Sequence, residues 1–238
     1  MTASLTEPRL VRAGGFSLLE LSIVLIVVGL LAGGLLGGVS AQRANAARQQ
    51  AERQLDVARE ALLAFAIANG RLPCPAAAAL PESDPAAGRE NCAREHGVLP
   101  WVSLGLPQND PWGRRLSYFA SAKFTALPTA GALAGFTMSS GLAPDNTGLA
   151  DVRSSSANGS RTQAIELAAV VVSHGAQGSG AYRPDGGQIA GASGDQAENA
   201  DQDLIFVADL PTASFDDQLS WISPHLLKAR LIAAGKLP

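Results

Sequence analysis

The sequence predicts an α+β fold, in which a long N-terminal helix packs on a small antiparallel β-sheet body that ends in a short C-terminal helix. Two observations support this prediction. An apolar run over residues 16–39 continues into an amphipathic stretch over 40–69, and the remaining chain alternates short apolar segments with loops rich in Pro and Gly. With 47% hydrophobic and 16% charged residues, the chain has the composition of a folded protein rather than a disordered one.

The apolar run is long enough to predict a membrane-spanning helix. A helix over residues 16–39 would be roughly 36 Å long, which exceeds the hydrocarbon thickness of a bilayer. Its one charge is Glu20, and an ionised carboxylate at such a position needs an opposite charge nearby. Glycines recur at four-residue spacing, which favours close packing of like helices; they are Gly29, Gly33 and Gly37.

The second half of the predicted helix carries one apolar face. Small and apolar side chains stand three or four positions apart between Ala44 and Phe65. Asn69-Gly70, followed by Pro73, is a typical helix stop. We expect this face to lie under the globular body, and the alternative is a coiled-coil dimer.

The residues around the start of the apolar run resemble a known processing site. Gly14-Gly15-Phe16-Ser17-Leu18-Leu19-Glu20, after a short polar leader, is similar to the cleavage segment of type IV prepilins and type II secretion pseudopilins. The resemblance implies that prepilin peptidase cuts after Gly15 and methylates Phe16, and that Glu20 pairs with the N-terminus of a neighbouring subunit. It divides the chain into a leader (1–15), a transmembrane assembly helix (16–39), its amphipathic continuation (40–70) and a globular domain (71–238).

The predicted function is therefore a structural subunit of a type IV pilus-like or pseudopilus filament, and not an enzyme. The implied partners are prepilin peptidase, other copies of the chain, related pilin-like subunits and an inner-membrane assembly platform. The implied location is a single span in the inner membrane, with the C-terminal domain periplasmic and then part of a periplasmic or extracellular filament. Since the net charge is −3, no nucleic-acid partner is expected.

Other interpretations of the N-terminus stay open. The segment also looks like a secretory signal cleaved after Ala41, although its length and Glu20 oppose this. The chain would then be a secreted or membrane-anchored binding protein of the adhesin kind, or less readily an anchored enzyme. Catalytic motifs are scarce: Ser173-His174 is the one Ser-His neighbour pair, and adjacent strand residues point to opposite faces.

The two cysteines predict a disulfide. Cys74 and Cys92 lie in a segment rich in Pro and Ala, where closing a loop of this size stabilises the fold by about 3 kcal/mol. The alternative is a metal site made of both cysteines and His96, but the spacing lacks a CxxC pair. A disulfide also implies an oxidising compartment.

The globular body contains several predicted strands and turns. Asp110-Pro111-Trp112-Gly113 predicts a turn that leads into a strand over 114–120, with Leu116 and Tyr118 on one face and Ser117 and Phe119 on the other. Apolar segments at 164–182 and 201–210 predict two adjacent antiparallel strands, and residues 121–163 give no clear signal. Ser223, Pro224 and Gly235 predict a capped C-terminal helix.

The long loop before residue 210 contains several acidic residues whose oxygens suit Ca²⁺. Three of them, Asp195, Asp201 and Asp203, are candidate calcium ligands. The DPWG turn and the Ser173-His174-Gly175 stretch resemble features of major pseudopilins, in which a calcium loop follows a comparable stretch. The alternative is an ordinary solvated acidic loop, because no EF-hand spacing is present.

Overall fold

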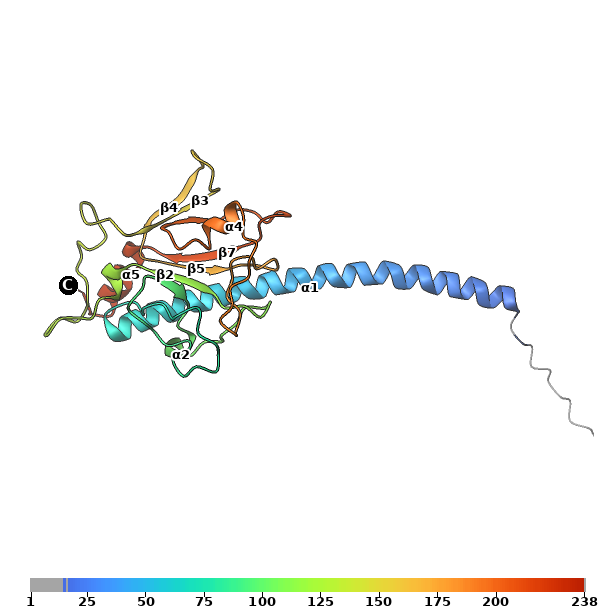
Figure 1. The fold of residues 1–238 in the computed structure, drawn as a ribbon, viewed down its shortest axis with the longest axis horizontal. Helices are drawn as coiled ribbons and strands as arrows, with labels where there is room; N and C mark the ends of the chain where they lie inside the picture. The colour runs from blue at the N-terminus through green and yellow to red at the C-terminus, as the bar shows by residue number, and fades with distance from the viewer. Residues whose placement is uncertain (1–14, 16, 238) are drawn as a thin grey trace, which may run out of the picture. The chain divides into compact units, whose positions relative to one another are not determined.

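The computed structural model describes residue 15 and residues 17–237, and the side chains of residues 32–40 lie outside that description. The fold is α+β (Figure 1). It divides into two compact units, one within residues 1–46 and one comprising residues 47–238. The predicted leader lies almost entirely outside the described residues, and so does Phe16.

The elements follow in this order along the chain: α1 (Leu18–Asn69), β1 (His96–Val98), α2 (Trp101–Leu104), β2 (Ser117–Ala120), α3 (Ala122–Thr125), β3 (Ala150–Arg153), β4 (Thr162–Leu167), β5 (Ala169–Ser173), α4 (Asp195–Glu198), β6 (Ile205–Val207), β7 (Gln218–Ile222) and α5 (Pro224–Ala233). Strands β1-β2-β5-β7 form an antiparallel sheet in that order. A second sheet has the order β4-β3-β6, in which β3 is antiparallel to β4 and parallel to β6.

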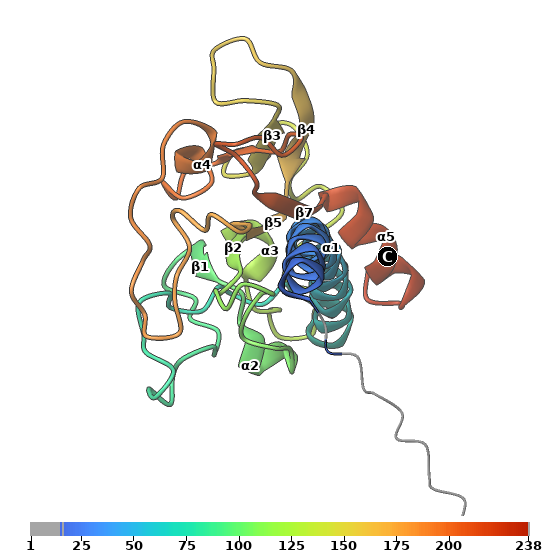
Figure 2. The same ribbon diagram turned by 90° about the vertical axis from the view of Figure 1, so that its right-hand side faces the viewer.

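The second unit has three layers around the four-stranded sheet. Residues 47–69 of α1 and helix α5 cover one face, where Leu62 and Leu231 pack with Tyr118 and Val171. The three-stranded sheet covers part of the other face (Figure 2), where Phe119 packs with Val152, Phe206 and neighbouring side chains. Alternate residues of β2 therefore enter different cores, as the sequence predicts for this strand.

Both predicted helix ends in the second unit are confirmed. Helix α1 ends at Asn69, and Gly70 has a φ of +69°, a conformation that suits glycine after a helix. The Ser223 side chain accepts a hydrogen bond from the backbone N–H of Leu226, and Pro224 occupies the first turn of α5. The buried face of α1 is also confirmed, because Ala51, Leu55, Ala58 and Leu62 are at most 3% exposed.

Two strand predictions need correction. The segment 164–182 is not one strand: it contains the end of β4 and all of β5, which belong to different sheets. Glu166 has a φ of +56°, and the Ala168 N–H donates a hydrogen bond to the carbonyl oxygen of Ile222 in β7. The chain therefore passes from one sheet to the other at this point. The strand within 201–210 pairs with β3 rather than with β5, so the predicted antiparallel neighbours are also wrong.

The predicted membrane-spanning half of a long N-terminal helix is wrong as well. Within the described residues, no helix combines the length and the apolar character needed to cross a membrane. The predicted transmembrane segment and the single-span inner-membrane location are therefore corrected.

The disulfide between Cys74 and Cys92 is confirmed. Glu90 lies beside it and accepts two hydrogen bonds from the Arg71 guanidinium, at 2.8 and 2.9 Å, and one from the Cys74 N–H at 3.2 Å. The Arg71 hydrogen bond, supported by the Cys74 N–H, holds the pKa of Glu90 below its usual value despite partial burial. The alternative metal site is excluded, because both sulfurs are bonded to each other.

Candidate functional site

The predicted processing and assembly segment begins the first unit. Gly15 is exposed, whereas Phe16 lies outside the described residues. Glu20 is exposed in the first turn of α1, and its backbone N–H donates to Ser17 Oγ at 3.1 Å. Ser17 and Glu20 have the S-x-x-E spacing of a capping box. The helix N-terminus therefore already favours a carboxylate at this position.

The helix that follows Glu20 exposes its apolar side chains. Between Leu18 and Leu31, the large apolar residues are 48% to 88% exposed. Glu20 is the one ionisable side chain in this stretch. Exposed apolar surface of this extent is typical of a contact surface rather than of solvent-facing helix.

The DPWG turn lies directly against the stretch after β5. Asp110 is buried, and its two carboxylate oxygens accept hydrogen bonds from the Trp112 and Arg114 N–H groups and, at 3.0 Å, from Ser173 Oγ. The Arg114 guanidinium in turn donates to the carbonyl oxygens of Gly175 and Ala176. The DPWG turn and the stretch after β5, which both resemble features of major pseudopilins, are therefore joined by direct side-chain bonds.

A second polar group crosses the four-stranded sheet. Ser117 Oγ lies 2.8 Å from His174 Nε2, and His174 Nδ1 lies 3.5 Å from Asp217 Oδ2. Asp217 Oδ2 also accepts a hydrogen bond from the Asn199 amide, whose other polar contacts are to the backbone of Val207. No local sequence pattern predicts this group, because its members are far apart along the chain.

The three predicted calcium ligands have local hydrogen-bond partners. Asp195 Oδ1 accepts hydrogen bonds from Ser155 Oγ and from the N–H and Oγ of Ser156; these bonds lower the pKa of Asp195, although burial acts to raise it. Asp201 and Asp203 are exposed. Their carboxylates accept hydrogen bonds from the backbone N–H groups of Asp203 and Ile205, respectively, at the start of β6. Partial burial raises the pKa of Asp201, with the Asp203 carboxylate adding to the effect.

The three aspartates are not gathered into one cluster. Among the described His, Cys, Asp and Glu side chains, the group whose ligand atoms lie within 4.8 Å of one another is Cys74, Glu90 and Cys92. Calcium binding by Asp195, Asp201 and Asp203 therefore stays a prediction.

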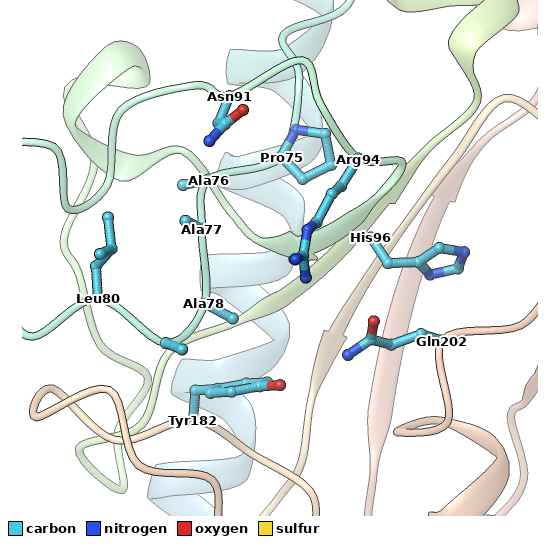
Figure 3. A pocket seen from close by; sticks show the side chains of 12 residues that line it. Pro75, Ala76, Ala77, Ala78, Leu80, Asn91, Arg94, His96, Tyr182 and Gln202 are labelled. Carbon is cyan, nitrogen blue, oxygen red and sulfur yellow. The ribbon is translucent and has the colours of Figure 1, made fainter.

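A polar hollow lies beside β1. It has a volume of about 260 Å³ and is bounded by the chain from Pro75 to Leu80, by Arg94 and His96, and by Tyr182 and Gln202. Figure 3 shows the Arg94 guanidinium directed into its centre, with His96 and Gln202 on one side and the alanine segment on the other. His96 packs against the Phe119 ring at 4.8 Å, and burial lowers the pKa of its imidazole.

Comparisons of the chain with protein-family models, curated proteins and solved structures find no match.

Proposed function

We propose that the chain is a structural subunit of a pilin-like filament, of the type IV pilus or type II secretion pseudopilus kind. In this proposal, prepilin peptidase cuts after Gly15, and the new N-terminus at Phe16 pairs with Glu20 of a neighbouring copy. The observation that carries it is the exposed apolar helix between Leu18 and Leu31, with a single carboxylate near its start.

An assembly of like helices accounts for both parts of this observation. Covering the large apolar side chains removes them from water, at roughly 25 cal/mol for each Å² buried. Such burial is not directional, so it cannot by itself set how far one helix is shifted along the next. The bond between Glu20 and a new α-amine supplies that register, because a buried charge is costly unless it is paired.

The globular unit supports the proposal in a second way. The DPWG turn and the Ser173-His174-Gly175 stretch were each singled out by resemblance, and Asp110 and Arg114 bind the second feature directly. A turn and a loop fixed to each other in this way form a rigid edge on the body. Such an edge is suited to carry contacts between subunits.

The first test is the mass of the N-terminal peptide after co-expression of the full chain with a prepilin peptidase. The proposal expects a mature chain that starts at methylated Phe16. A chain that starts at Gln42 would support a secreted protein instead. An intact leader under conditions in which a reference prepilin is processed would also contradict the proposal.

The second test separates assembly from helix capping. Glu20→Gln keeps a residue that fits a capping box but removes the charge, so the helix is expected to form while filament yield falls at least about tenfold, the change that 1.4 kcal/mol per contact produces. Asp56→Asn is the matched control, because Asp56 is an exposed carboxylate on the same helix. Normal filament yield from processed Glu20→Gln subunits would refute the charge pairing.

A further inference from the structure

We propose that Ser117, His174 and Asp217 form a nucleophile, base and acid relay that hydrolyses small carboxylic esters. This activity is separate from filament assembly and does not depend on it. The geometry is that of a serine hydroxyl 2.8 Å from one imidazole nitrogen, with a carboxylate oxygen 3.5 Å from the other nitrogen. With the proton on Nδ1, His174 faces the carboxylate with a donor and the serine with an acceptor.

The sheet holds the three side chains in a row. Strand β5 lies between β2 and β7; Ser117 begins β2, His174 directly follows β5 and Asp217 directly precedes β7. Ser117 pairs in register with Val172, two positions before His174, and Gln218, one position after Asp217, pairs with Ser173. Groups on a hydrogen-bonded strand, or directly next to its end, keep their mutual positions better than groups within long loops.

The burial of the relay changes from one end to the other. The His174 and Asp217 side chains are fully buried, whereas Ser117 is partly exposed. Among the described residues, His174 Nδ1 and Asp217 Oδ1 have no hydrogen-bond partner, although buried polar atoms normally have one. The 3.5 Å separation is long for a hydrogen bond, and catalytic hydrogen bonds are often long before substrate binds.

Ser117, the partly exposed member of the relay, lies next to a hollow that a substrate can occupy. Ser117 lines a small hollow whose walls include His96, Gly97, Tyr182 and Gln202, and these four residues also line the 260 Å³ pocket of Figure 3. The two hollows therefore adjoin. A small ester can place its bulk in the larger one and its carbonyl group at the serine hydroxyl.

Gln202 lies in the wall that the two hollows share. Its backbone has a φ of +66°, which is uncommon for a residue other than glycine, and its side chain carries two N–H donors. Strained backbone of this kind is concentrated at functional sites.

The reaction follows from these positions. Ser117 Oγ attacks the ester carbonyl carbon and forms a C–O bond, while its proton moves to His174 Nε2. The carbon–oxygen bond to the alcohol breaks, and the proton passes from His174 to the departing alkoxide. Water then attacks the acyl-serine, giving its proton to His174, and release of the carboxylic acid returns that proton to Ser117. Asp217 is a positioning residue, since it acts through His174.

The first experiment labels the full chain with diisopropyl fluorophosphate. The serine oxygen forms a bond to phosphorus, fluoride leaves, and His174 takes the proton, so peptide mapping should find the phosphoryl group on Ser117. Ser117→Ala is expected to lose the label. Ser220→Ala is the matched control and should keep it, because Ser220 is a serine of intermediate exposure on a strand of the same sheet. A folded chain with no label on Ser117, under conditions that label a known serine hydrolase, would overturn the proposal.

The second experiment measures hydrolysis of p-nitrophenyl acetate by the same proteins. Asp217→Asn should lower kcat by roughly 10²- to 10⁴-fold with little change in KM, because it disturbs the base and not the pocket. Turnover that is equal in the parent and Ser117→Ala, or labelling of Ser117 at an unchanged rate in folded Asp217→Asn, would show that the three residues are a structural bond network only.

Discussion

Replacing Glu90 by Gln should destabilise the globular unit by about 2 kcal/mol. The Arg71 side chain is 10% exposed, and both of its terminal nitrogens donate to the Glu90 carboxylate, which also accepts the Cys74 N–H. A glutamine keeps one acceptor oxygen and turns an NH₂ group toward the guanidinium. The loss is therefore about one hydrogen bond to a charged group, worth roughly 1.5–3 kcal/mol.

Urea unfolding of the full chain measures this effect. With an m value of about 2 kcal/mol/M, the expected loss lowers the urea midpoint by about 1 M. Glu82→Gln is the matched control, because it changes an exposed glutamate in the same loop region, and it should change stability by less than about 0.5 kcal/mol.

The same pair predicts a pH dependence with a definite sign. The Arg71 hydrogen bond lowers the pKa of Glu90 in the folded state, so its stabilising contribution is present above the unfolded pKa of about 4.3 and is lost as the pH falls through the folded pKa. The difference in unfolding free energy between the parent and Glu90→Gln should be constant from about pH 7 to 5 and should become smaller below about pH 4. Two results would refute the ion pair as the origin of this stability difference. One is a free-energy difference that stays the same down to pH 3, and the other is equal urea midpoints of the two proteins at pH 7.

Three further predictions concern the same unit. Removing the disulfide by a double Cys74→Ser, Cys92→Ser change should cost about 3 kcal/mol in the chain-entropy model, measured by urea unfolding with reduced parent protein as the control. Burial strongly raises the pKa of Tyr118, so its phenol should not ionise in folded protein titrated to pH 11 and followed at 295 nm, and Tyr118→Phe, which loses one buried hydrogen bond, should cost about 1 kcal/mol. Gly88→Ala should cost at least about 2 kcal/mol and change the tryptophan fluorescence, because its Cβ would lie 2.2 Å from the Trp101 ring at a φ of +71°.

Local signals in the sequence predicted several elements correctly. Ser223-Pro224 and Asn69-Gly70 mark helix ends through bonds that form within a few residues, so they do not depend on the rest of the fold. The two faces of β2 follow from the alternation of side chains along a strand. The disulfide was predictable because the chain has two cysteines, which allow a single intramolecular pairing.

The errors arose where the outcome depends on distant partners. The apolar segment 164–182 contains no Pro before residue 182, yet the chain changes sheets near Ala168, where Glu166 has a φ of +56° and Ile222 O, more than fifty residues later, accepts the Ala168 N–H. The strand within 201–210 has no local signal that chooses between β3 and β5 as its partner. The apolar run also suggested a membrane helix, whereas no helix among the described residues combines the length and the apolar character needed to cross a membrane.

The polar group across the sheet shows why sequence adjacency is a poor guide to catalytic partners. Ser173 and His174 are neighbours, and the expectation that they point to opposite faces is consistent with their bonds: Ser173 binds Asp110, whereas His174 contacts Ser117 and Asp217. Two strand pairings set these contacts, and pairing register is not written in either strand alone. A shift of one residue between β2 and β5 would move Ser117 to the other face and leave His174 without its contact. The contacts of the relay therefore depend on the sheet register. A change of register would remove them without any change in the amino-acid sequence.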